Sequence, residues 1–169
     1  MDLDILIAWV AALPLYNATP RPPEFAAAIA VVALERAPDA PEQLAATLDL
    51  IAAHESRYRL SARGDAGRSV GAYQTPRART PATIAGQTRL AAQMLDEAAR
   101  ACPLHPLWAY ASGRCAPSYA ARGMERAVAA SLAGAPELAA VAASLAGAPE
   151  LARATVLERD ELAGLRLEP

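Results

Sequence analysis

Apolar residues recur along most of the chain with the three- and four-residue spacing of a helix. Prolines and glycines interrupt this spacing, and several prolines stand where the first turn of a helix would accept them. The pattern predicts a mainly helical fold. The predicted helices cover residues 3–13, 23 to about 36, about 41 to 55, 84–101, 106–112 and 117 to about 132.

The third of these helices ends in a carboxylate. Its apolar face carries Leu44, Leu48 and Ile51, and Glu55 follows on the same face at the next helical spacing. Asp39 is predicted to cap this helix. A carboxyl group at the end of a buried face loses solvation, which favours the protonated form that a general acid needs. Glu55 is therefore the first catalytic candidate; the alternative is a helix-end glutamate that reaches solvent.

The helical pattern is lost between residues 61 and 74. Gly64, Gly67 and Gly71 break any helix there, and the short residues between them predict a small hairpin or tight loops. A proline-bounded loop over residues 76–81 follows. The predicted fold class is therefore mainly α, with a small β-hairpin beside the third helix.

Length and composition limit the number of domains and the classes of function. A chain of 169 residues fits one domain, predicted to span residues 1–169 with a motif-bearing core at about 38–128. Alanine makes up about a quarter of the chain and aromatic residues 5%, which favours closely packed helices. The net charge of −2 excludes a globally basic nucleic-acid binder.

Targeting signals and metal ligands are sparse. The first apolar stretch, residues 3–15, is too short to span a bilayer, and two aspartates stand where a secretory signal carries positive charge. We expect synthesis in the cytoplasm without a Sec signal, and no membrane span. Cys102 and Cys115 are predicted to be free thiols, with a disulfide formed after export as the alternative. No metal and no cofactor are expected, since a zinc site around His105 would need a distant fourth ligand.

A twelve-residue sequence, VAASLAGAPELA, occurs twice near the C-terminus, at residues 128–139 and 141–152. Its thirteen-residue period is too short for a solenoid repeat. We interpret it as a duplicated helix-turn unit in a C-terminal helical segment at about 128–169. The small side chains of such helices allow close docking, so this segment favours contacts with partner proteins.

Three short elements lie in order between residues 45 and 128: Glu55-Ser56-Arg57-Tyr58, the glycine-rich run from Gly64 to Gln74, and Tyr110-Ala111-Ser112-Gly113. In this order they resemble the lysozyme-like superfamily of peptidoglycan-cleaving enzymes. The likeness is greatest to the soluble lytic transglycosylase and goose-type branch, including phage members. In that family a helix-ending Glu-Ser pair supplies the acid, a glycine-rich hairpin walls the cleft, and a Tyr-Asn-x-Gly element faces the acid.

Position by position, the resemblance implies that Glu55 is the catalytic acid/base. The predicted substrate-binding residues are Ser56, Asp65, Ser69, Tyr73, Gln74 and Tyr110. Two positions depart from the family pattern. Ala72-Tyr73 stands where members often have Leu-Met, which we interpret as a retuned sugar subsite. Ala111 replaces the usual asparagine and so removes a polar group that would brace the cleft.

Asp65 decides between two reactions. A hydrolytic muramidase needs a second carboxylate, about 5 to 5.5 Å from the acid in a retaining enzyme and about 6.5 to 9.5 Å in an inverting one. Asp65 is the candidate, with a turn aspartate that bonds its own backbone as the alternative. In the latter case the resemblance implies lytic transglycosylation, in which Glu55 protonates the glycosidic oxygen and then helps the muramic 6-hydroxyl close a 1,6-anhydro ring.

Arginines and aromatic residues near these elements suggest substrate contacts. Residues 57–79 carry six arginines and one acid, a patch that would attract the anionic peptide stems of peptidoglycan; the alternative is a solvated face. Tyr58, Tyr73 and Trp108 are candidates to stack on sugar rings, with at least one expected in the core.

The sequence therefore predicts an enzyme that cleaves the β-1,4 bond between N-acetylmuramic acid and N-acetylglucosamine. It would act at the bacterial cell wall as a phage endolysin or virion component. A hydrolytic muramidase using Glu55 and Asp65 is one alternative. The other is a non-catalytic component of a phage particle that contacts structural proteins through its C-terminal helices.

Overall fold

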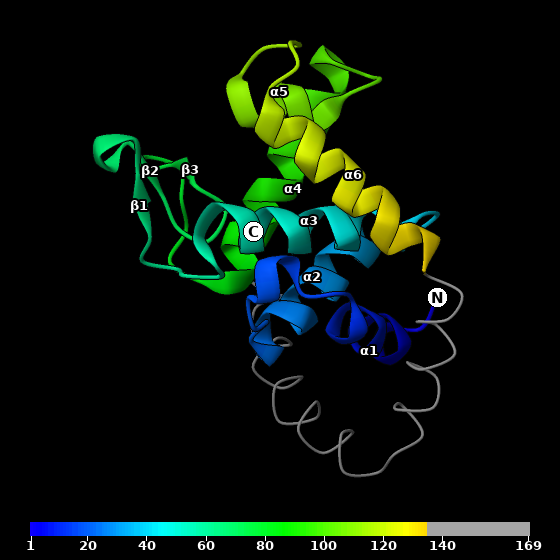
Figure 1. Ribbon diagram of the computed structural model, residues 1–169. Helices are drawn as coiled ribbons and strands as arrows, with labels where there is room; N and C mark the ends of the chain where they lie inside the picture. The colour runs from blue at the N-terminus through cyan, green and yellow to red at the C-terminus, as the bar shows by residue number, and fades with distance from the viewer. Residues whose placement is uncertain (135–169) are drawn as a thin grey trace.

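The computed structural model describes residues 1–134, whose arrangement is shown in Figure 1. In this range the chain forms six α-helices, two short 3-10 turns and a three-stranded antiparallel sheet, which confirms the mainly helical class with a small β region. The helices are α1 (Leu3–Ala12), α2 (Pro23–Arg36), α3 (Pro41–Ser56), α4 (Ile84–Ala101), α5 (Pro106–Ser112) and α6 (Tyr119–Ala133). The turns are η1 (Tyr16–Ala18) and η2 (Asp65–Gly67), and the strands are β1 (Arg63–Gly64), β2 (Ser69–Val70) and β3 (Thr75–Pro76).

The helix boundaries follow local sequence signals. Proline occupies the first turn of α2, α3 and α5, as predicted. Thr83 and Ser118 cap α4 and α6 by accepting hydrogen bonds from backbone N–H groups, at 3.1 Å in both cases. The predicted cap by Asp39 is wrong: Ala40 occupies the N-cap of α3, and no side chain bonds the first turn there.

Helix α3 lies at the centre of the described fold. It packs against α1, α2, α4 and α6, and Figure 1 shows it crossing the middle of the molecule with the sheet beyond its C-terminal end. The predicted apolar face of α3 is buried, because Leu48 and Ile51 are fully inaccessible to solvent. The last turn of α3 is therefore held against a packed core on several sides.

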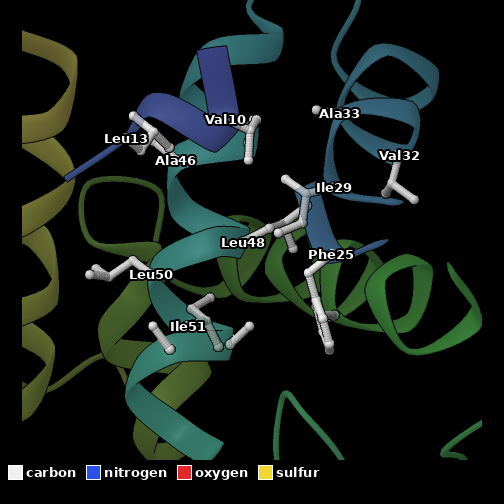
Figure 2. Close-up of a cluster of buried hydrophobic side chains, with 14 of the residues drawn as sticks. Val10, Leu13, Phe25, Ile29, Val32, Ala33, Ala46, Leu48, Leu50 and Ile51 are labelled. Atoms are coloured by element: carbon white, nitrogen blue, oxygen red, sulfur yellow. The ribbon is translucent and has the colours of Figure 1, made fainter. Parts of the chain in front are cut away.

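Figure 2 shows how the core is assembled from the N-terminal helices. Val10 from α1 and Phe25 and Ile29 from α2 lie against Leu48 of α3, and all four are at most 2% exposed. Many alanines join them in the core, and their small side chains let the helices approach closely. Helices α1 and α2 thus contribute to the core although they precede the motif-bearing segments.

The β region is a sheet of three two-residue strands in the order β1-β2-β3, one strand more than the predicted hairpin. Ser69 pairs with Gly64 on one side and with Pro76 on the other. Pro76 lies in an edge strand, where its missing N–H leaves no gap in the ladder. The third strand takes up the start of the segment that was predicted as a loop.

None of the helices among the described residues has both the length and the apolar character that a membrane span requires. Most of the repeated C-terminal sequence lies outside the described residues. The part that is described, residues 128–134, completes α6 and its C-terminal cap.

Candidate functional site

Glu55 lies in the last turn of α3 with its side chain 25% exposed. The chain reverses immediately afterwards, since Arg57 and Tyr58 both adopt left-handed backbone conformations with φ of 55° and 60°. Such conformations are costly for residues other than glycine, by about 1 kcal/mol each or more. Two consecutive strained residues thus fix the end of the helix, and they leave Glu55 both held in place and accessible.

Ser56 is the last residue of α3 and is buried. It is 3% exposed, and its hydroxyl donates to the carbonyl of Ala52 at 3.3 Å and accepts from the N–H of Arg59 at 3.0 Å. Both hydrogen-bonding capacities are used within the chain. These bonds give Ser56 a structural role at the helix end, and a substrate contact by Ser56 stays a prediction.

Tyr110 on α5 brings a second motif element to Glu55. Burial raises the pKa of the Tyr110 phenol above its ordinary value, and the nearby negative charge of Glu55 raises it further. The Tyr110 hydroxyl donates to the backbone carbonyl of Tyr73 at 3.1 Å. Tyr110 therefore stays neutral and joins α5 to the loop before β3.

Tyr73 belongs to the core. Its side chain is 1% exposed and its hydroxyl lies 3.1 Å from the hydroxyl of Thr88 on α4. Tyr58 is likewise buried, at 4% exposure. Both rings lie in the core, where at least one of the three aromatic candidates was expected, and a substrate contact by Tyr73 stays a prediction.

Gln74 and two glycines shape the loop that carries Tyr73. The Gln74 side chain donates to the carbonyl of Gly71 at 2.9 Å. A Cβ atom on Gly64 would lie 2.2 Å from Oε1 of Gln74, so a larger residue there would displace the Gln74 side chain. Gln74 thus braces the loop from within, and a role in substrate binding stays a prediction.

Asp65 begins the exposed turn η2. Its Oδ2 accepts a hydrogen bond of 2.7 Å from the Ser69 hydroxyl, across the turn that connects β1 to β2. Asp65 also has a positive φ of 48°. The Asp65 carboxylate thus bonds a side chain within its own turn, whereas the alternative predicted a bond to the backbone. The bond engages both Asp65 and Ser69, two of the predicted substrate-binding residues.

A buried ion pair between α3 and the segment that follows η1 was not anticipated from the sequence. Asp49 on α3 is 4% exposed and binds the Arg21 guanidinium, with a distance of 2.6 Å from Nη2 to Oδ2. The Tyr58 hydroxyl donates to Oδ1 of Asp49 at 2.9 Å. Arg21 also donates to the carbonyls of Ala11 and Leu13. These bonds connect α3 and the chain reversal after it to the end of α1. The feature of the sequence that could have indicated the pair is an aspartate flanked by Leu48 and Leu50.

Gln87 is a second buried polar residue that the sequence did not reveal as important. It is 3% exposed, and its Oε1 accepts from the N–H of Ala72 at 2.8 Å. Its Nε2 donates to the carbonyl of Pro81 at 3.0 Å. Gly71 leaves room for this side chain, because a Cβ there would lie 2.3 Å from Oε1 of Gln87. Gln87 anchors the β region to α4.

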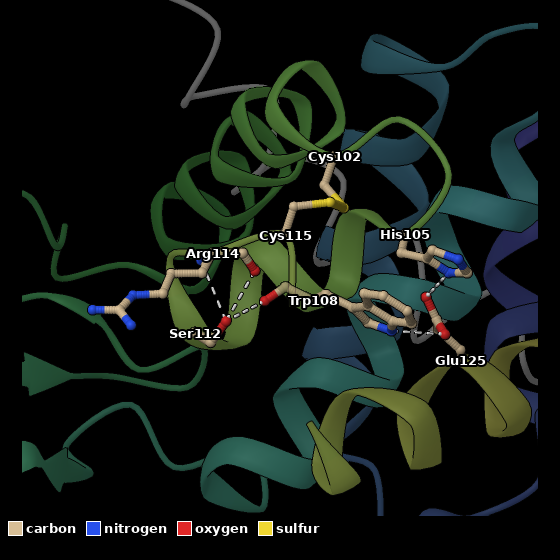
Figure 3. Close-up of a disulfide and its surroundings, with 7 residues drawn as sticks. All are labelled: Cys102, His105, Trp108, Ser112, Arg114, Cys115 and Glu125. Atoms are coloured by element: carbon tan, nitrogen blue, oxygen red, sulfur yellow. Dashed lines mark hydrogen bonds and ion pairs between the residues drawn. A yellow bond between two sulfur atoms is a disulfide. The ribbon is translucent and has the colours of Figure 1, made fainter. Parts of the chain in front are cut away.

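The segment that carries Tyr110 is closed by a disulfide between Cys102 and Cys115, shown in Figure 3. The expectation of free thiols is therefore wrong, and the disulfide of the alternative is present. Within the loop, the rings of His105 and Trp108 stack with centroids 3.8 Å apart, and Glu125 on α6 accepts hydrogen bonds from Trp108 and His105 at 3.1 Å. One face of Trp108 is covered in this way.

His54 precedes Glu55 in α3, and neighbouring residues on a helix point about 100° apart. Its side chain nevertheless reaches the catalytic candidate, with Nδ1 lying 3.4 Å from Oε1 of Glu55. Among residues 1–134, no group of three or more histidines, cysteines and carboxylates has the geometry of a metal site.

Family models, curated proteins and solved structures were each compared with this chain, and none matches it. The geometry of the described residues therefore carries the functional proposal.

Proposed function

We propose that the protein is a lysozyme-like enzyme that cleaves the β-1,4 glycan bond of peptidoglycan, and that it acts as a lytic transglycosylase with Glu55 as acid/base. One observation carries this proposal. The three motif elements, which are far apart in the sequence, converge at the end of α3: Glu55 lies near Tyr110, and Tyr110 bonds the backbone of Tyr73.

The proposed reaction uses one carboxyl group twice. Protonated Glu55 gives its proton to the glycosidic oxygen between N-acetylmuramic acid and N-acetylglucosamine, and the bond from that oxygen to the muramic C1 breaks. The resulting carboxylate then takes the proton of the muramic 6-hydroxyl as that oxygen bonds C1. The product is a 1,6-anhydro ring, no water is consumed, and Glu55 ends protonated as it began.

The local bonding of Asp65 favours this reaction over hydrolysis. A hydrolytic muramidase would require Asp65 as a nucleophile or as a base that activates water. Asp65 instead accepts the Ser69 hydroxyl within its own turn. The muramidase alternative therefore has less support, and product analysis separates the two.

The charge distribution supports an anionic polymer as substrate. All six arginines between residues 57 and 79 are exposed, with Asp65 as the one acid among them, although the whole chain has a net charge of −2. Peptide stems of peptidoglycan carry carboxylates that such a surface attracts. The proposed site of action is the bacterial cell wall, as a phage endolysin or virion component.

The test is clearing of peptidoglycan embedded in a gel by the purified full chain. We expect the wild type to clear the gel and Glu55→Gln to leave it intact, with both proteins showing the same circular dichroism and thermal midpoint. A wild-type protein that clears no peptidoglycan from several bacterial walls would overturn the enzyme proposal and favour the non-catalytic alternative. Near-full activity in Glu55→Gln would overturn the role of Glu55.

A further inference from the structure

His54 has an unusual environment for a histidine next to a catalytic candidate. Its Nδ1 atom is buried and has no hydrogen-bond partner among residues 1–134. The nearest carboxylate atom is Oε1 of Glu55 at 3.4 Å, within ion-pair range but longer than a normal hydrogen bond. A buried polar atom without a partner is costly, so a contact with Glu55 is the natural way to satisfy it.

The charged and titratable groups around this pair come from three elements. Glu55 faces His54 from α3, and the ring of Tyr16 in η1 lies 5.8 Å from the His54 ring. Tyr110 on α5 lies close enough to Glu55 for the carboxylate charge to raise the pKa of the phenol. Of these groups, Glu55 is the one whose charge acts on His54.

We propose that His54 is a positioning residue for Glu55, one that orients the carboxyl group through Nδ1 and shares a proton with it. This inference rests on the proposed function. With one proton on the pair, the proton lies either on Nδ1 of His54, beside a carboxylate, or on Glu55, beside a neutral imidazole. The second form is the one that protonates the glycosidic oxygen.

The shared proton sets the pH above which the pair has no proton left to give. Contact with Glu55 raises the pKa of His54 above its ordinary value, against the opposing effect of partial burial. The last proton therefore leaves the pair only when the pH passes the raised pKa of the imidazole. Without His54 the last proton would reside on a carboxyl group, and carboxyl groups lose protons at lower pH than imidazolium.

The first experiment follows the protonation of the histidines directly by NMR, and it needs no activity. The chain contains two histidines, so His105, which contacts Glu125, serves as an internal reference. We expect the His54 ring signals to titrate at lower pH in Glu55→Gln than in the wild type, while the His105 signals stay unchanged. Identical His54 titrations in the two proteins would overturn the proposal, whether or not the protein is an enzyme.

The second experiment measures the rate of peptidoglycan cleavage against pH in two variants. His54→Asn keeps an N–H donor near the Nδ1 position but cannot carry charge, whereas His54→Ala removes the donor as well. We expect the basic limb of the profile to move to lower pH in both, by roughly one to two pH units. The rate on the acidic side should be retained in His54→Asn and should fall several-fold in His54→Ala.

The outcomes separate the two claims. Basic limbs that coincide in the wild type and His54→Asn would overturn the proposal while leaving the proposed function in place. Inactivity of the wild type at every pH would overturn the proposed function, and the NMR titration would still decide whether His54 and Glu55 share a proton. His105→Gln is the matched control, and its pH profile should follow that of the wild type.

Discussion

The C-terminal end of α3 and the turn between β1 and β2 each present a carboxylate, but the two carboxylates have different surroundings. Glu55 is partly buried, contacts His54, and lies near Tyr110 from another helix. Asp65 is exposed and bonds Ser69, four residues later in the same turn. The contacts of Glu55 bring separate elements together, whereas the Asp65–Ser69 bond closes a local turn.

This difference bears on the reaction. A carboxylate held among several packed elements can be positioned to within a fraction of an ångström, which acid catalysis requires. An exposed turn aspartate is screened by water and held by weaker local bonds. The comparison therefore points to a reaction that needs one well-positioned carboxyl group.

The largest expected effect separates the two carboxylates by activity. Glu55→Gln should lower the rate of peptidoglycan cleavage by about 10²- to 10⁴-fold, the usual contribution of a general acid. Asp65→Asn keeps the size of the side chain and should lower the rate by no more than about threefold. Initial rates of turbidity loss from purified cell walls measure both, and an Asp65→Asn rate as low as that of Glu55→Gln would favour the hydrolytic alternative.

The next effect concerns the buried ion pair between Asp49 on α3 and Arg21. Asp49→Asn leaves the Arg21 guanidinium buried without its counter-charge, and we expect the free energy of unfolding to fall by about 3 to 5 kcal/mol. Urea unfolding followed by circular dichroism gives this value. Glu35→Gln is the control, because Glu35 pairs with Arg89 on the surface, both about 40% exposed, and should lose less than about 1 kcal/mol. Equal losses in the two variants would show that the buried network does not anchor the site.

The disulfide tests the side of the site that carries Tyr110. Replacing both Cys102 and Cys115 by serine should lower the free energy of unfolding by about 3 kcal/mol, because the bond closes a short loop in the unfolded chain. Reduced wild type should unfold at the same urea concentration as the double variant. If a reductant leaves the unfolding midpoint of the wild type unchanged, the disulfide does not stabilise the loop.

The smallest effect concerns the charged surface around the Asp65 turn. Replacing the exposed Arg57, Arg63 and Arg77 by glutamine should weaken binding to purified peptidoglycan several-fold at low ionic strength, and the difference should shrink as salt is added. Co-sedimentation over a series of salt concentrations measures it. Arg114→Gln, another exposed arginine outside this segment, is the control. Binding that is independent of both salt and these three charges would indicate a solvated face without a role.

Much of the helical fold could be predicted because its signals are local. Proline in the first turn, helical spacing and glycine breaks are all read within a few residues, and they place all six described helices to within about two residues. Glu55 was found for the same reason, since it continues an apolar face. The sheet was anticipated as a hairpin, and its third strand was missed because pairing of β3 depends on contacts outside the strand itself.

The parts that were missed depend on contacts between distant residues. Asp49 and Arg21 are 28 positions apart, and the spacing of neither residue predicts that they pair. Tyr73 was assigned to substrate from its place in a motif, but a motif gives order along the chain and not burial. The contact between His54 and Glu55 could not be predicted from ideal helix angles, because these angles do not account for the reach of a side chain. Free thiols were expected because the sequence predicts synthesis in the cytoplasm, and the sequence does not give the distance between the two cysteines.

The most direct test of Glu55 as the single acid/base is the chemistry of the products. Purified glycan strands are digested in isotopically labelled water, and the muropeptides are analysed by mass spectrometry. A lytic transglycosylase forms 1,6-anhydromuramic ends that are lighter by one water and carry no label, and this is the result we predict. Reducing ends that contain labelled oxygen would contradict the account and identify a hydrolase.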